Sequence, residues 1–143
     1  MKFTNSLIKG KLLKRYKRFF ADIKVNNKII TAHCPNTGSM QGLLDQGNEV
    51  LVTEHNDPKR KLKFTLEIIK AKKRYVGVNT HRANKIVHHG LENKLISEFK
   101  TIKNIKPEFK FSDDTRFDFL CDNYLIEVKN VTLFRENDIA EFP

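Results

Sequence analysis

The chain has 143 residues, of which 39% are hydrophobic, with eleven Phe and no Trp, enough for one medium-sized domain or two small ones. Its formal net charge is +10, and its apolar runs are too short for a transmembrane helix or a signal-peptide core. The two cysteines, Cys34 and Cys121, are too few for a four-cysteine zinc site or a disulfide framework. We therefore expect a cytoplasmic protein without a membrane partner.

The positive charge is concentrated in the first half of the chain. Residues 1–79 hold 17 Lys and Arg against 6 Asp and Glu, whereas residues 80–143 hold 10 against 11. Such asymmetry indicates a polyanion-binding module joined to a unit with a different task. Lysine-rich surfaces without a binding role are also common, and the charge total does not separate the two interpretations.

The first half is typical of short β-strands separated by turns. Asn26-Asn27 is a plausible tight hairpin turn, and Asn56-Asp57-Pro58 separates two later strands. The expected strands are Phe19–Val25, Lys28–Cys34, Glu49–Thr53, Lys63–Ile69 and Tyr75–Val78. About five short strands in this length predict a small Greek-key barrel, with the OB-fold as the leading candidate.

Helical spacing begins after the last of these strands. Asn79 or Thr80 could cap a helix, and Gly90 is expected to break it before a second helical stretch, Leu91–Phe99. The expected helix has apolar residues at Ala83, Ile86, Val87 and Leu91, and the strands that follow are Phe109–Phe111, Phe117–Cys121 and Tyr124–Val131. A helix followed by strands predicts a second α/β unit that starts near Thr80.

Three basic clusters lie in the first half of the chain, and the first two are the candidates for nucleic-acid contact; the third comprises Lys70, Lys72, Lys73 and Arg74. Cations neutralise phosphates and release counterions, and an aromatic ring between them offers a base a stacking surface. We expect Phe19 and Phe20, which follow the first cluster, to lie in the core. The alternative for the lysines is a solvated rim. The candidate residues are Lys14, Arg15, Tyr16, Lys17 and Arg18 in the first cluster, and Lys59, Arg60 and Lys61 in the second.

An acidic hairpin carries the most specific chemistry. If Asp122-Asn123 forms the turn, Cys121 faces Tyr124 and the register places Asp118 opposite Glu127, with Cβ atoms roughly 5 Å apart. Two carboxylates so placed repel each other, and a Mg²⁺ or Mn²⁺ ion would offset the repulsion. Lys129, two residues after Glu127, could stabilise charge on a phosphate. The alternative is an exposed hairpin whose acids are neutralised by Arg116 and Lys129.

The segment His33–Met40 has the composition of a shaped loop. His33 and Cys34 could be metal ligands or a nucleophile pair, but a thiol nucleophile needs a positioned base and no third group accompanies them. We expect a rigid turn that packs between the domains.

Several of these segments resemble the sugar fermentation stimulation protein A family. The matching residues, in order, are Arg15–Phe19, His33–Gly38, Arg60-Lys61, Val78–Thr80 with Ala83-Asn84, Arg116–Phe119 and Glu127–Leu133. The resemblance implies an N-terminal OB-fold, a C-terminal domain like that of PD-(D/E)XK nucleases, DNA binding, and a role in regulating sugar metabolism, maltose in particular. It also implies that Asp118, Glu127 and Lys129 correspond to the nuclease-like motif.

Two departures from the family pattern stand out. His88-His89 lies where relatives carry an acidic residue on the first helix of the nuclease-like domain, and we expect both histidines at the surface. The family also continues for several dozen residues beyond Pro143. We therefore expect a companion fragment, self-association or an unstable second half, because an unpaired sheet edge and an apolar face would be exposed.

Together these observations predict an α+β protein. An OB-fold-like barrel over residues 1–79 precedes a partial PD-(D/E)XK, restriction-endonuclease-like α/β domain over residues 80–143. The leading hypothesis is a DNA-binding protein with little or no catalysis. The alternatives are a Mg²⁺- or Mn²⁺-dependent nuclease that uses Asp118 and Glu127 as ligands with Lys129, and a regulator that acts through a protein partner.

Overall fold

The computed structural model describes residues 1–134, 140 and 141. The chain divides into two compact units: one comprises residues 2–80 and 130 onward, and the other comprises residues 81–129 together with Met1. Within the expected C-terminal domain, residues 135–139, 142 and 143 lie outside the described residues. None of the described helices combines the length and apolar character needed to cross a membrane.

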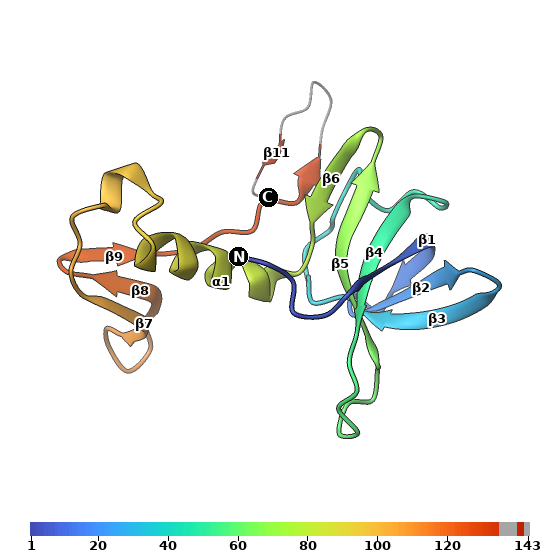
Figure 1. Cartoon of the computed structure of the whole chain (residues 1–143), viewed down its shortest axis with the longest axis horizontal. Coiled ribbons are helices and arrows are strands. Elements are labelled where there is room, and N and C mark those ends of the chain that lie inside the picture. The colour runs from blue at the N-terminus through green and yellow to red at the C-terminus, as the bar shows by residue number, and fades with distance from the viewer. Residues whose placement is uncertain (135–139, 142–143) are drawn as a thin grey trace. The chain divides into compact units, whose positions relative to one another are not determined.

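The first unit is a closed barrel with one added strand (Figure 1). The strands pair in the order β3-β2-β1-β4-β5-β6, and a parallel pairing between β3 and β5 closes the ring of the first five. This is the expected OB-fold arrangement, in which closure removes the exposed sheet edges. The strands are β1 (Leu7–Tyr16), β2 (Phe20–Val25), β3 (Lys28–His33), β4 (Glu49–Glu54), β5 (Phe64–Ala71) and β6 (Arg74–Gly77).

The barrel core follows from alternation along the strands. In β2, Ala21 and Ile23 are fully buried and face inward, so the residues between them face outward. The predicted turn at Asn26-Asn27 is confirmed, because Val25 pairs with Lys28 and Asn26 adopts the left-handed backbone (φ 52°) that Asn tolerates. The remaining core residues include Leu12, Ala32, Met40, Leu43, Val50, Val52, Leu66, Ile69 and Val78.

Strand β1 was absent from the expected elements. Its inward positions include Gly10, a residue that weakens strand patterns, and its outward positions carry Lys9 and Lys11. The glycine is required by packing, since a Cβ at Gly10 would lie 2.5 Å from Cγ2 of Ile23. The close approach of β1 to β2 therefore requires glycine at a position where the sequence pattern alone favours a loop.

The second unit packs a helix and a short 3-10 turn against a three-stranded sheet. Its sheet has the order β7-β8-β9, with both pairings antiparallel. Its core comprises Leu91, Ile102, Phe119 and Cys121, with half-buried neighbours such as Val87, Ile126 and Val128. The elements are α1 (Thr80–Glu92), a 3-10 turn (Ser97–Phe99), β7 (Ile105–Lys110), β8 (Arg116–Cys121) and β9 (Tyr124–Ile126).

The expectation that Gly90 breaks the helix is wrong. Helix α1 continues to Glu92, and Gly90 is buried where a Cβ would lie 3.3 Å from the Ile96 side chain. Glycine therefore suits the close packing at this position, and the segment that follows forms only the 3-10 turn instead of a second helix. Strand β9 is also shorter than expected, while a separate pairing joins β10 (Leu133–Phe134) to β11 (Ala140–Glu141).

Candidate nucleic-acid interface

The first basic cluster lies at the end of β1 and in the β1–β2 turn, residues 17–19. Lys17 (φ 46°) and Arg18 (φ 60°) both adopt the left-handed backbone, which costs roughly 1–2 kcal/mol for an ordinary L-residue. Arg15 braces the turn, because its guanidinium donates to the Arg18 carbonyl at 2.9 Å and to the Asn36 carbonyl at 2.7 Å. The turn is thus a fixed platform that holds two cationic side chains at the surface.

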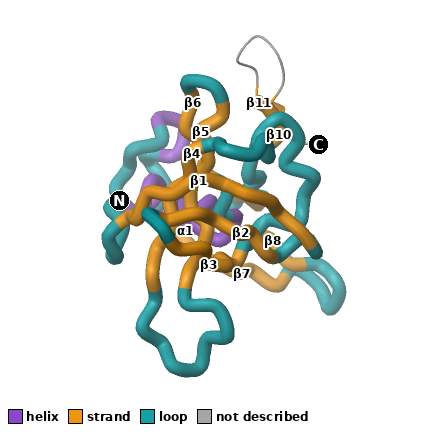
Figure 2. The backbone as a smooth tube through the Cα atoms, turned by 90° about the vertical axis from the view of Figure 1, so that its right-hand side faces the viewer, coloured by secondary structure: helices purple, strands orange, loops and turns teal. Residues whose placement is uncertain are grey.

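Aromatic side chains form a row across the outer faces of β1, β2 and β3, which lie next to one another in Figure 2. Tyr16 pairs with Phe20 and Phe20 pairs with His33, so their side chains leave the same face of the sheet. The Tyr16 and Phe20 rings stack with centroids 5.5 Å apart, and Lys14 Nζ lies 5.2 Å from the Tyr16 ring centroid. We call Tyr16, Phe20 and His33 the aromatic row.

Phe19 lies beside this row in the β1–β2 turn. Its ring is nearly parallel to the His33 ring (20°) at a centroid distance of 6.5 Å, and the residue is 45% exposed. The expectation that Phe19 and Phe20 lie in the core is therefore wrong. The core-facing residue at this point is Ala21, and the alternation of β2 turns Phe20 outward.

The second basic cluster lies in the β4–β5 loop, residues 55–63. Asp57 organises the loop, because its carboxylate accepts the Lys59 N–H at 2.9 Å and its carbonyl accepts the Arg60 N–H at 3.2 Å. The Arg60 guanidinium donates to the Thr65 hydroxyl at 2.9 Å, so this cation anchors the loop to β5. Lys59 and Lys61 are exposed.

Both clusters meet the same end of β3. His33 pairs with Phe20, the first β2 residue after the turn, and also with Thr65, the residue that Arg60 contacts. In OB-folds the outer face of strands 2 and 3, together with the loops joining strands 1–2 and 4–5, binds oligonucleotides. The candidate cations predicted from sequence therefore lie in these two loops and at the adjoining end of β1. Tyr16 was predicted as a stacking ring, whereas the outward position of Phe19 and Phe20 was not.

The loop after β3 is hydrogen-bonded to the β1–β2 turn and is partly buried. Cys34 and Asn36 are buried, and the Cys34 N–H donates to the Phe19 carbonyl at 2.7 Å. The Asn36 side chain donates to Thr132 and accepts from the Gly38 N–H, which agrees with a rigid turn. Burial raises the pKa of the Cys34 thiol, which disfavours the thiolate and gives no support to the alternative of a nucleophile pair.

The acidic hairpin of the second unit has the predicted register only near its turn. Cys121 pairs with Tyr124 and Phe119 with Ile126, as expected. The ladder then ends, so the predicted strand pairing of Asp118 with Glu127 is wrong. The Asp118 carboxylate accepts the Val128 N–H at 2.7 Å, which replaces the β8 carbonyl that the longer ladder would supply.

The three residues that the resemblance predicts as a nuclease-like motif make separate contacts. The Asn84 amide of α1 donates to Asp118 Oδ1 at 2.5 Å, and Lys129 Nζ lies 2.7 Å from Glu127 Oε1. Arg116, which sequence reasoning offered as a neutralising partner, lies 3.7 Å from Glu108. The alternative of a neutralised hairpin thus holds for Glu127 through Lys129, while Asp118 is held by neutral donors.

These carboxylates fit a divalent cation only as a partial ligand set. Within the described residues, no group of three His, Cys, Asp or Glu comes together as a metal-binding cluster. Mg²⁺ accepts one or two carboxylates when waters and phosphate oxygens complete its shell. Asp118 and Glu127 supply carboxylates of the kind that this requirement names, and the Asn84 amide of the helix contacts Asp118.

The two helix histidines differ in their surroundings. The His88 ring lies 5.5 Å from the Phe119 ring, and its Nε2 lies 3.5 Å from Glu92 Oε1. His88 is therefore half-buried against the core instead of lying free at the surface as expected. His89 is near Asn93, whose amide nitrogen lies 3.1 Å from His89 Nδ1.

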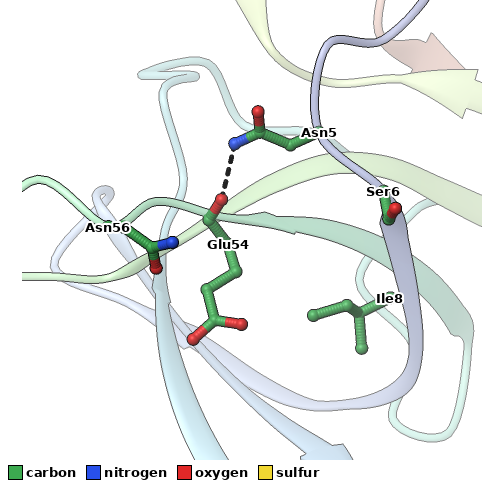
Figure 3. Close-up of a pocket in the computed structure, with 5 residues that line it drawn as sticks. All are labelled: Asn5, Ser6, Ile8, Glu54 and Asn56. Carbon is green, nitrogen blue, oxygen red and sulfur yellow. Dashed lines mark hydrogen bonds between the residues drawn. The ribbon is translucent and has the colours of Figure 1, made fainter.

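A pocket on the barrel lies between the N-terminal segment and the start of the β4–β5 loop (Figure 3). Asn5, Ser6, Ile8, Glu54 and Asn56 line it, and Asn5 Nδ2 donates to the Glu54 carbonyl at 2.6 Å. Its one ionisable side chain, Glu54, would repel phosphate. The pocket therefore has no part in the candidate interface.

A closed OB barrel with cationic loops, joined to a unit of one helix and a small sheet, defines a protein with an OB-type N-terminal module. Residues 13–78 match the family model described as the SfsA N-terminal OB domain, and residues 81–143 match the one described as the sugar fermentation stimulation protein RE domain. The chain belongs to the sugar fermentation stimulation protein family.

Curated relatives agree with this membership. The sugar fermentation stimulation protein homolog of Pelagibacter ubique is 63% identical over 100% of this chain and 63% of its own length. The homolog of Alteromonas mediterranea is 44% identical over 100% of this chain and 65% of its own length. The chain thus spans less than two thirds of the length of these relatives.

A solved structure supports the fold. The structure of Pyrococcus furiosus SfsA in complex with Ca²⁺ matches 85% of this chain and 51% of that chain, with a TM-score of 0.72 and 21% sequence identity. At this identity the likeness establishes the fold alone.

Proposed function

We propose that this protein binds DNA through the cations of the β1–β2 turn and the β4–β5 loop. The observation that carries the proposal is the position of both basic clusters in the two loops that OB-folds use for oligonucleotides. Lys14, Lys17, Lys59 and Lys61 are exposed, and Arg15 and Arg60 fix the backbone that presents them. A role in sugar metabolism would then follow from DNA binding.

Phosphate contacts predict how strongly the affinity for DNA falls as the salt concentration rises. Each phosphate neutralised on duplex DNA contributes roughly −0.9 to the slope of log K against log salt concentration. If four to five lysines and arginines make contact, the slope is about −4. A regulator that acts only through a protein partner would show no such slope.

The test compares two pairs of lysines. Lys59→Gln/Lys61→Gln removes charge from the β4–β5 loop, and Lys72→Gln/Lys73→Gln removes the same charge from the β5–β6 turn as the matched control. Binding to a labelled duplex is measured by fluorescence anisotropy over a range of salt concentrations. We expect the first variant to lower the slope by about 2 and the control to leave it nearly unchanged. Equal effects, or a flat response of the unaltered protein, would contradict the proposal.

A second candidate function is metal-dependent cleavage of a phosphodiester. It is favoured by the fixed Asp118 carboxylate, which Asn84 and the Val128 N–H orient, and by the Ca²⁺ complex of the Pyrococcus furiosus relative. Asp118 and Glu127 would hold a divalent cation, which neutralises phosphate charge when bound. The Lys129 ammonium is paired with Glu127 in the structure. If Glu127 held the divalent cation, this ammonium would instead be available to contact the phosphate.

The cleavage test uses end-labelled DNA with Mg²⁺ or Mn²⁺ and the Asp118→Asn variant. Metal-dependent cutting that the variant abolishes would support the second candidate. Intact DNA that is still retained by the protein in a salt-sensitive manner would leave binding as the function.

A further inference from the structure

We infer that the barrel binds single-stranded nucleic acid by stacking an unpaired base on Phe19. The inference rests on the proposed DNA binding and names the form of ligand that the same surface accepts. It follows from the exposed ring that directly follows Lys17 and Arg18 in the β1–β2 turn, which phosphate contact alone does not explain.

Phe19 is held in place while its ring remains accessible. Its N–H donates to the Lys17 carbonyl at 2.7 Å, and its carbonyl accepts the Cys34 N–H, also at 2.7 Å. The residue is nevertheless 45% exposed, although a phenyl ring normally contributes free energy by burial. A fixed backbone with an exposed ring lowers the ordering cost of a stacking contact.

The aromatic row on the sheet lies beside the Phe19 ring. The His33 ring lies nearly parallel to the Phe19 ring. The Tyr16 and Phe20 rings stack on each other, and the Lys14 ammonium lies over the Tyr16 ring. Asp22 accepts hydrogen bonds from the Tyr16 and Thr31 hydroxyls, so the one carboxylate on this face is engaged. The rings therefore form an organised apolar strip on the outside of a barrel.

The charges around Phe19 suit the backbone of the same strand. Lys17 and Arg18 directly precede it, and Lys14 lies on the adjacent β1 strand. Bases in a duplex stack on their neighbours and present only their edges in the grooves, so an exposed ring on a sheet meets a base face only in a single strand. Rings flanked by cations are the combination that single-strand binders use.

The absence of tryptophan from the sequence allows a direct reporter. Phe19→Trp places a single indole at the proposed stacking position, and Tyr75→Trp places one on β6, where Tyr75 is 57% exposed, as the matched control. Each variant is titrated with a thymidine oligonucleotide, a uridine oligonucleotide, a strand of the same length without bases, and a duplex.

We expect a thymidine or uridine strand to quench the emission of Phe19→Trp and to leave that of Tyr75→Trp unchanged. The strand without bases should bind but fail to quench, since it offers phosphates alone. A comparison of the thymidine and uridine strands tells whether DNA or RNA is preferred. Phe19→Ala, measured by anisotropy, should weaken binding to the base-containing strand roughly tenfold, within the range of one stacked base, and leave binding to the abasic strand unchanged.

The outcomes separate this inference from the proposal on which it rests. Salt-sensitive binding to duplex and single strand alike, with no effect of Phe19→Ala and no quenching at position 19, would overturn base stacking and leave DNA binding intact. Quenching of Tyr75→Trp instead would show that the strand binds near β6, and it would overturn both the stacking on Phe19 and the assignment of the binding face to β1, β2 and β3. No binding to any strand would overturn the proposed function itself.

Discussion

The β1–β2 turn should show a trade-off between stability and DNA binding. Lys17 and Arg18 both have positive φ values, 46° and 60°, which are unfavourable for these residue types. Asn and Gly adopt this backbone at less cost, so the variant Lys17→Asn/Arg18→Gly should relieve roughly 2–3 kcal/mol. The greater freedom of Gly in the unfolded chain takes back about 0.4–1 kcal/mol, which leaves a net gain of about 1–2 kcal/mol.

The same variant removes two cations from the proposed interface. Two lost phosphate contacts lower the salt slope by about 2, and at about 0.1 M salt this corresponds to a loss of affinity of about 60-fold. Arg15 still donates to the carbonyl of residue 18, because that contact involves the backbone alone. The turn should therefore keep its shape while its affinity for DNA falls.

Urea denaturation and fluorescence anisotropy with labelled DNA measure the two effects. The matched control is Lys72→Asn, since Lys72 also has a positive φ of 53° but lies in the β5–β6 turn. The control should be stabilised and should bind DNA almost as the unaltered protein does. A less stable double variant would refute the backbone reasoning, and a double variant that binds as well as the control would refute the assignment of the phosphate contacts.

Three further predictions concern the framework. Gly10→Ala places a Cβ 2.5 Å from Ile23 Cγ2, so the free energy of unfolding measured in urea should fall by about 1–3 kcal/mol; an unchanged value would mean that β1 and β2 separate easily. Arg15→Lys loses the two-carbonyl bridge from Arg18 to Asn36 and should destabilise the barrel by about 1–3 kcal/mol in the same assay, whereas a neutral result would show that the bridge is dispensable. Hydrogen bonds from the Lys103 and Asn104 N–H groups lower the pKa of Asp122, so its stabilising effect is present above the unfolded-state pKa and is lost as the pH falls through the lower folded-state pKa. Thermal unfolding from neutral to strongly acidic pH should show a smaller acid-dependent loss for Asp122→Asn, and identical profiles would exclude that contribution.

The fold could be predicted from sequence wherever a two-residue turn fixed the pairing of the residues next to it. Asn26-Asn27 and Asp122-Asn123 each set a register that the structure confirms. Strand β1 could not be predicted, because its inward Gly10 is explained only by the closeness of Ile23, a residue on another strand. Gly90 was misread for the same reason, since its neighbour Ile96 is brought near by the fold.

The candidate site was predicted in its charges and in Tyr16, but not in Phe19 and Phe20. The lysines and arginines were found because clusters of cations are visible along the sequence. Phe19 and Phe20 were assigned to the core because large apolar residues are usually buried. The outward position of Phe20 depends on which face of β2 holds Ala21, and that is set by the closure of the barrel. Phe19 lies outside the strand, in the β1–β2 turn.

The point at which the β8–β9 ladder of the acidic hairpin ends could also not be predicted from the sequence. A two-residue turn predicts which residues pair near it, and extrapolation of that register paired Asp118 with Glu127. The ladder ends earlier because the Asp118 carboxylate takes the Val128 N–H. A side chain that replaces a backbone acceptor leaves no trace in the alternation of apolar residues, so the end of a ladder cannot be found from the pattern.

The most direct test of the proposed interface is a map of amide chemical shifts as an oligonucleotide is added to the isotopically labelled protein. We expect the largest changes in the β1–β2 turn, at the His33 end of β3 and in the β4–β5 loop, with the β5–β6 turn unaffected. Changes centred on the β5–β6 turn or on the acidic hairpin, or no changes at all, would contradict the assignment of DNA binding to this face of the barrel.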